Sequence, residues 1–301
     1  MRSLCQISLA WGAAAVAVAA AGGGAVKVAP PPPPLKRAAP VPPPGASLPP
    51  DARCPALPAV RPPFAFSPGE MLEYDLDALG MGAGKLRVAV APLEDGALPI
   101  LVEATTNTLF SKIRRVVGGT RSDLDPRTLR PLRYLEEATE DGVHKKARVR
   151  FHPQERAADL EWTWGTRSGH WSLRHGPEGL DAAGAIFLLR ALPWKTGART
   201  CFDVYSIRRI WRVVGQVEAR EHVSLPLGEF EAWHLSGVAI LADDPRRRRE
   251  LHLWVSDDRR RLPLVAVGTI DLGAVRATLT AVTRAGEKSA RAQDPVRTLK
   301  W

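Results

Sequence analysis

The chain has 301 residues, of which 45% are hydrophobic and 25% are charged, and its net charge is +10. This composition is that of a globular protein with a sizeable core, so it excludes a chain that is disordered throughout. The positive charge does not indicate a nucleic-acid partner, because half of it lies in residues 1–63 and the remaining arginines alternate with acidic residues in short runs.

Residues 1–26 begin with a short basic segment and continue as an uncharged, alanine-rich run with small residues suited to cleavage. This pattern is typical of a secretory signal peptide, and it predicts export to the periplasm or cell envelope. An uncleaved membrane anchor is the alternative, because the uncharged run approaches the ~20 residues that span a bilayer. Cys5 precedes the apolar run, whereas a lipid-modified cysteine would follow it, so we do not expect lipidation.

Residues 27–63 are rich in proline, and such a segment is extended or disordered. We expect it to be a spacer between the leader and the folded domain. Cys54 lies near its end, and removal of the leader leaves only Cys54 and Cys201. In an oxidising compartment such a pair favours a disulfide, with two separate thiols as the alternative.

From Met71 onward, apolar and polar residues alternate, as in Leu86, Val88 and Val90, and turn residues separate the alternating segments. This pattern predicts many short strands joined by short turns. Such strands form an antiparallel sheet, since a parallel sheet would need more crossover helices than this chain offers.

One apolar segment, residues 181–192, predicts a helix, because it opens with Asp181 as an N-cap candidate and ends before Pro193. Its wide apolar surface must be covered, so we expect it to pack on the sheet. The predicted fold is therefore mainly β, a large curved antiparallel sheet or incomplete barrel with one short helix. A single domain over residues 64–285 and a disordered tail over 286–301 complete the predicted organisation.

Two segments carry a resemblance to a known family. The first runs from Pro68 to Tyr74 and reads PGE-x-L-x-Y, and the second runs from Leu251 to Gly268 and contains Asp257, Asp258, Arg261 and Pro263. Together they resemble DUF3108, a family of exported bacterial proteins of unknown function, over roughly residues 64–283. The resemblance implies a helical segment ending in Leu-Arg midway through the chain, and it implies no activity.

The sequence contains no constellation that predicts catalysis. It lacks a G-x-S-x-G elbow and a phosphate loop, and no cysteine or histidine spacing is typical of zinc. Antiparallel strands bring distant residues together, so a site built from His222, His234 and His252 stays open as a minor hypothesis. We predict that the protein is not an enzyme and needs no metal or cofactor.

Asp257 and Asp258 allow two interpretations. Paired acids serve acid–base chemistry in many enzymes. Alternatively, the carboxylates cap backbone N–H groups of a tight turn and pair with the arginines that follow. We favour the turn.

Tryptophans supply the remaining candidates for a ligand site, and the alternative is that they fill the core. The candidates lie on predicted strands: Trp162, Trp164, Trp211, Trp233 and Trp254. The leading hypothesis is an exported envelope protein without catalytic activity that binds an apolar or amphiphilic, lipid-like ligand on the concave face of its sheet. The alternative is a structural or interaction module that contacts an envelope partner from the end of the proline-rich spacer.

Overall fold

A computed structural model describes residue 54, residues 56–78, 80–206, 209–270 and 273–284, and residues 296, 299 and 301. The predicted leader and most of the predicted spacer lie outside this described part. Within it, no helix is both long and apolar enough to span a bilayer.

The first half of the domain consists of antiparallel strands and one short 3-10 helix: β1 (Met71–Ala78), β2 (Met81–Val90), β3 (Leu98–Thr106), η1 (Phe110–Lys112), β4 (Val116–Leu124), β5 (Pro131–Glu140), β6 (Val143–His152), β7 (Ala157–Trp164) and β8 (Arg167–Arg174). The second half contains the α-helix and longer strands: β9 (Gly179–Asp181), α1 (Ala182–Ala191), β10 (Arg199–Ser206), β11 (Arg209–Leu225), β12 (Gly228–Leu241), β13 (Asp244–Ser256), β14 (Pro263–Ile270) and β15 (Gly273–Thr283).

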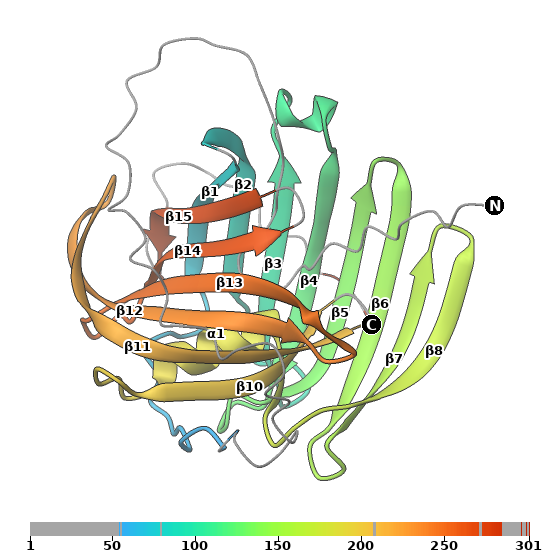
Figure 1. Cartoon of the computed structure of the whole chain (residues 1–301), viewed down its shortest axis with the longest axis horizontal. Helices are drawn as coiled ribbons and strands as arrows, with labels where there is room; N and C mark the ends of the chain where they lie inside the picture. Colours follow the sequence, from blue (N-terminus) through green and yellow to red (C-terminus); the bar gives the residue numbers. More distant parts are fainter. Residues whose placement is uncertain are drawn as a thin grey trace.

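The strands of the described residues form one 15-stranded sheet, in the order β8-β7-β6-β5-β4-β3-β2-β1-β15-β14-β13-β12-β11-β10-β9. Every pairing is antiparallel except that of β9 with β10. The sheet is unclosed, since β8 and β9 stand at its two ends. The predicted fold class, a curved antiparallel sheet with one helix, is confirmed (Figure 1).

The ladder of β1 with β15 joins the two halves of the sheet on one side, and on the other side they meet through side chains. One face of β10 and β11 presents Tyr205 and Ile210, which pack with Tyr134 and Leu160 of the first half in one apolar cluster. The rings of Tyr134 and Tyr205 meet edge to face with centroids 5.6 Å apart. We call this overlap of β10–β11 with β5–β7 the seam.

Helix α1 lies between the two halves of the sheet (Figure 1). Asp181 caps its N-terminus, because one carboxylate oxygen accepts from the backbone N–H of Gly184 at 2.9 Å. The other oxygen accepts from the hydroxyl of Ser122 in β4 at 2.6 Å, which fixes the helix to the first half. The predicted helix 181–192 is therefore present, with Asp181 and Leu192 as its caps.

Apolar side chains of both halves and of α1 form the main core. Phe187 and Leu188 of the helix are buried against residues such as Ile100 and Leu124 of the first half and Val255 of the second. The helix therefore does not lie on a separate surface, because both halves of the sheet cover it.

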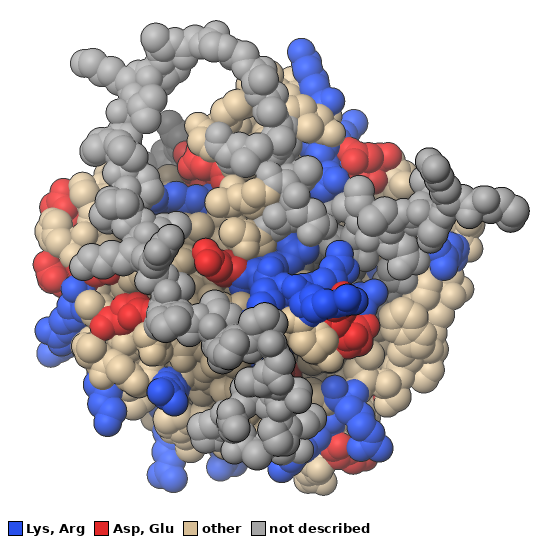
Figure 2. Space-filling view, in the orientation of Figure 1, with Lys and Arg blue, Asp and Glu red and all other residues tan. Residues whose placement is uncertain are grey.

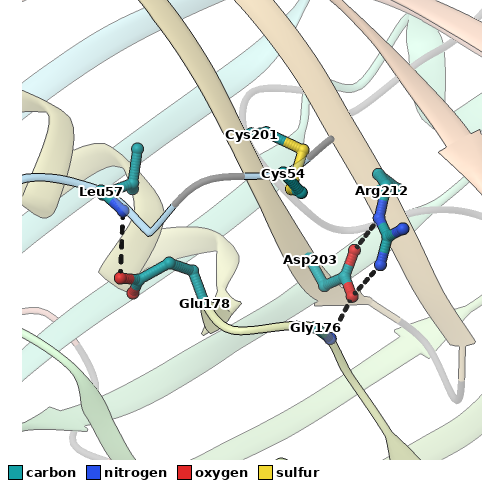
Figure 3. Close-up of a disulfide and its surroundings, with 7 residues drawn as sticks. All are labelled: Cys54, Leu57, Gly176, Glu178, Cys201, Asp203 and Arg212. Atoms are coloured by element: carbon teal, nitrogen blue, oxygen red, sulfur yellow. Dashed lines mark hydrogen bonds and ion pairs between the residues drawn. A yellow bond between two sulfur atoms is a disulfide. The ribbon is translucent and has the colours of Figure 1, made fainter. Parts of the chain in front are cut away.

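A disulfide joins Cys54 to Cys201 of β10, with Cα atoms 5.1 Å apart (Figure 3). Next to it, the backbone N–H of Leu57 donates to Glu178 at 3.2 Å. Leu57 and Val60 are buried in the main core. These two residues belong to the predicted spacer, so the packed part of the chain begins before residue 64.

Three residues of the predicted tail are described, and they contact the domain. Val296 and Leu299 are buried. The indole N–H of Trp301 donates to Asp123 of β4 at 3.0 Å, and the guanidinium of Arg133 lies 4.8 Å from the centroid of the Trp301 ring.

Candidate functional site

An apolar groove lies on the concave face of the second half, between α1 and strands β10–β14. Alternation along each strand directs one set of side chains toward the helix, for example Phe202 and Val204 from β10 and Leu251 and Leu253 from β13. We call this space the α1 groove. The residues that line it include Ala185, Ile186, Leu189, Val213, Gly215, Leu235, Gly237, Ala239, Ala266 and Gly268.

Small residues form the floor of the α1 groove. Gly215 and Gly237 are direct partners in the β11–β12 ladder. A Cβ atom at Gly215 would lie 2.5 Å from the carbonyl oxygen of Ser236, so this close crossing of strands requires glycine. With Ala239 and Ala266 beside them, the glycines leave a cavity of about 100 Å³.

The mouth of the α1 groove is polar on one side. The guanidinium of Arg249 lies 5.1 Å from the centroid of the Trp211 ring, and it donates to the carbonyl of Thr269 at 3.2 Å. Figure 2 shows lysine and arginine side chains gathered near the middle of the face on which β13 lies. Arg249 thus gives the apolar groove a cationic residue at its edge.

The structure does not bring the five predicted tryptophans together. Trp211 lines the α1 groove, whereas Trp162 lines a second cavity at the seam. The ammonium group of Lys145 lies over the ring of Trp164, 3.9 Å from the ring centroid. Trp233 and Trp254 donate through their indole N–H groups to acidic side chains, and each is buried in a different apolar cluster.

Asp258 organises the β13–β14 turn. Its carboxylate accepts from the backbone N–H groups of Arg260 at 2.9 Å and Arg261 at 3.2 Å, and from the hydroxyl of Ser256 at 2.7 Å. Burial acts to raise the pKa of Asp258, but the hydrogen bonds from Ser256 and Arg260 outweigh it and hold the pKa below its usual value. Asp258 is thus an ionised acceptor that a turn requires.

Asp257 has a different set of partners, which lie on β11, on β12 and within the turn. It accepts from the indole N–H of Trp233 at 2.6 Å and from the guanidinium of Arg220 at 2.7 Å. Arg261 lies 3.9 Å from it and adopts a positive φ of 47°. Asp258 thus makes the contacts of the turn interpretation, whereas Asp257 mainly links the turn to β11 and β12.

Arg190, at the end of α1, connects both segments that carry the family resemblance. Its side chain is buried and bonds the carboxylate of Glu70 at 2.6 and 3.2 Å. It also donates to the backbone carbonyls of Arg260 at 3.2 Å and Arg261 at 2.9 Å. The opening strand segment, the helix and the β13–β14 turn therefore meet at one guanidinium.

A second link between the same segments is the phenol of Tyr74, which donates to the carbonyl of Pro263 at 2.9 Å. Sequence reasoning identified the turn and the Leu-Arg of the helix but missed the partnership of Glu70 with Arg190. The available signal was a single arginine in an otherwise apolar helix, since such a charge must find a buried partner.

Two of the three histidines considered as a site are neighbours. His234 Nε2 lies 3.0 Å from His252 Nδ1, and His234 Nδ1 lies 2.9 Å from Glu221. Trp254 stacks on His234 with centroids 4.3 Å apart. His222 is elsewhere and pairs with two glutamates. Among the described residues no group of three metal-ligating side chains is formed.

Burial and the nearby charge of His234 lower the pKa of His252, so this imidazole stays neutral down to a lower pH than a histidine in water does. Two other titratable carboxyls are buried, one in β5 and one at the N-terminus of α1. Burial raises the pKa of Glu136 to about 7 and that of Asp181 to about 6. Neither carboxyl lines the α1 groove. Asp181 caps the helix, and Glu136 lies next to Tyr134 of the seam.

The fold and the site define a mainly β protein in which an unclosed antiparallel sheet wraps around one helix and leaves an apolar groove beside it. The chain belongs to DUF3108, a family of proteins of unknown function, whose model matches residues 73–280. A comparison with curated proteins gives no match.

Three solved structures are similar to this chain, and the first of them supports the fold. A β-barrel-like protein of the domain of unknown function DUF1849 from Brucella abortus is 11% identical, with a TM-score of 0.52 over 75% of this chain and 99% of that chain. A candidate exported protein with a YmcC-like fold from Bacteroides fragilis is 8% identical, with a TM-score of 0.31 over 75% of this chain and 100% of the other. A candidate lipoprotein from Parabacteroides distasonis is 9% identical, with a TM-score of 0.31 over 73% and 98%.

Proposed function

We propose that the protein binds the apolar part of an amphiphile in the α1 groove, without catalysing a reaction on it. One observation carries this proposal: the concave face next to α1 is apolar but not filled, because its floor is made of glycine and alanine. In a core built only for stability, such a position is normally filled, since unfilled space costs packing energy.

The size of the cavity favours a narrow ligand. Its volume of about 100 Å³ is roughly that of three waters in the liquid. Small-molecule sites that enclose a whole ligand measure ~300–1,000 Å³. The groove therefore suits the end of an alkyl or acyl chain, with the rest of the ligand outside it.

The cationic edge favours an anionic headgroup. Arg249 lies at the rim, and its contacts with Trp211 and with the carbonyl of Thr269 hold it there. A guanidinium in this position binds carboxylate or phosphate through paired hydrogen bonds. A fatty acid or another single-chain anionic lipid thus satisfies both the apolar interior and the edge.

The same proposal places the protein in the periplasm or cell envelope. The N-terminal pattern of residues 1–26 supports export, and the disulfide between Cys54 and Cys201 suits an oxidising compartment. The intact mass of the protein recovered from the envelope fraction tests this point. A reduced protein that retains residue 1 in the cytoplasm would contradict it.

The binding experiment compares two substitutions on adjacent residues of β12. Ala239 lines the α1 groove, whereas the next side chain, Val238, points to the opposite face. In Ala239→Phe the added ring occupies much of the cavity. Val238→Phe adds a ring of the same kind outside the groove and serves as the control.

The measurements are native mass spectrometry of the purified protein and titration with cis-parinaric acid, a fluorescent fatty acid. We expect saturable binding to the native chain and to Val238→Phe, and binding about ten-fold weaker or more in Ala239→Phe, a difference of ~1.4 kcal/mol. Circular dichroism establishes that both variants are folded. The absence of binding to the native chain, or equal binding to both variants, would overturn the proposal.

A further inference from the structure

A second cavity opens at the seam, on the side away from the α1 groove. Its volume is about 450 Å³, and it lies between the β7–β8 hairpin and the ends of β11 and β12. We call it the seam cleft. The residues that line it are Trp162, Arg167, Trp171, Leu173, Arg174, Arg209, Ile210, Ala242 and Asp243.

The aromatic wall of the seam cleft is built around a glycine. Trp162 and Gly169 are partners in the β7–β8 ladder, and a Cβ atom at Gly169 would lie 2.8 Å from the Trp162 indole. The indole therefore lies across the bare backbone of Gly169. Trp171 stands beside it, with ring centroids 5.5 Å apart and a tilt of 52°, and its side chain is 43% exposed.

The lining of the seam cleft carries more positive than negative side chains. Arg167, Arg174 and Arg209 line it, and Asp243 is the acidic residue in its wall. Asp243 pairs with Arg209. Among the residues that the structure describes, no acidic side chain is paired with Arg167 or Arg174. The cleft thus offers two guanidinium groups beside two indole rings.

We infer that the seam cleft binds an anionic saccharide, that is, a sugar ring that bears a phosphate or carboxylate group. The faces of the two indole rings offer apolar surface to the C–H groups of a sugar ring. Guanidinium groups bind phosphate and carboxylate through paired, charge-assisted hydrogen bonds. The volume also falls within the ~300–1,000 Å³ of small-molecule sites.

This inference does not depend on the ligand of the α1 groove. The two cavities share no lining residue, and they lie on opposite faces of β11, with Trp211 toward the groove and Ile210 toward the cleft. A lipid in the groove and a saccharide in the cleft are therefore separable by mutation.

The test uses the full chain and calorimetric titration with four probes: glucose 6-phosphate, glucuronate, glucose and inorganic phosphate. The site variant is the double substitution Arg167→Gln and Arg174→Gln. The control is Arg148→Gln with Arg150→Gln, because both of these arginines are exposed on β6 and the loss of charge is the same. All four positions are exposed, so both double variants are expected to fold.

We expect saturable binding of at least one of the two anionic sugars, weakened about ten-fold or more in the site variant and unchanged in the control. In Trp171→Ala the affinity for that sugar should fall to the affinity for inorganic phosphate. Equal losses in the two double variants would show attraction by net charge alone and overturn the inference. So would binding of neither anionic sugar, or binding of glucose as tight as that of its anionic forms.

Discussion

The buried contact between Arg190 and Glu70 gives the sharpest prediction about stability. In Arg190→Met the methionine retains most of the apolar bulk, but the carboxylate of Glu70 and the carbonyls of Arg260 and Arg261 lose their donor. Glu70 is only 6% exposed, so water does not replace that donor. Removal of one partner from a buried ion pair costs about 3–5 kcal/mol.

Urea unfolding measures this loss. With a slope near the upper end of ~1–3 kcal/mol per molar urea, the midpoint should fall by about 1–2 M. Arg246→Met is the control, because the Arg246 side chain is 92% exposed, and a substitution there should change stability by less than about 0.5 kcal/mol.

A double variant separates the buried charge from the packing. The double variant Glu70→Gln with Arg190→Met has no unpaired carboxylate. Its loss of stability should therefore be about 1–3 kcal/mol smaller than the sum of the losses in the two single variants. Additive losses, or a loss in Arg190→Met below about 1 kcal/mol, would refute the role that we assign to this contact.

Three further outcomes are expected. Replacement of Cys54 and Cys201 by serine should destabilise the protein by about 2–5 kcal/mol, where the upper end is the chain-entropy value for the observed separation of 147 residues; an unchanged urea midpoint would contradict this. Burial raises the pKa of Glu136 from 4.5 to about 7, so Glu136 keeps its proton up to a higher pH in the folded state than in the unfolded state. The contribution of Glu136 to stability is then fully present below pH 4.5 and falls by about 1.4 kcal/mol per pH unit toward pH 7. Unfolding curves of Glu136→Gln between pH 4 and 8 should lack this decline, and parallel curves for the two proteins would exclude the effect. Asp258→Ala should cost about 1–3 kcal/mol through the lost turn contacts and leave cis-parinaric acid binding unchanged; weaker binding would point to a direct role of this residue.

The sequence predicted the local structure of this protein much better than its long-range contacts. Alternation at Leu251, Leu253 and Val255 correctly predicted a strand, because the period of two depends only on neighbouring residues. The opposite face, with His252 and Trp254, is buried as well, which the alternation did not indicate. The pairing of β1 with β15 joins Leu72 to Val282. No local pattern encodes such a pairing, since it arises only when the whole sheet curves.

The candidate site could not be assembled from the sequence for the same reason, although Trp211, one of the predicted residues, lines it. The α1 groove exists because Gly215 lies opposite Gly237, and that register is visible only when β11 and β12 are paired. The tryptophans were identified as a group by residue type, but Trp233 and Trp254 lie on adjacent strands and belong to different apolar clusters. Residue type alone does not specify the face of a strand, so core and pocket could not be distinguished.

The seam encloses the interior by side-chain contacts, which differs from the closure of a barrel. A closed barrel can widen only by breaking ladder hydrogen bonds, because each strand is bonded on both sides. Here the described strands β8 and β9 end the sheet, and the overlap rests on side chains such as Tyr134, Tyr205 and Ile210. Among the described strands, no ladder limits how far these margins overlap; the side-chain contacts do, together with the ion pair of Arg130 with Glu178. The width of the interior is thus set by side-chain packing at the seam, whereas in a closed barrel it is set by strand number and stagger.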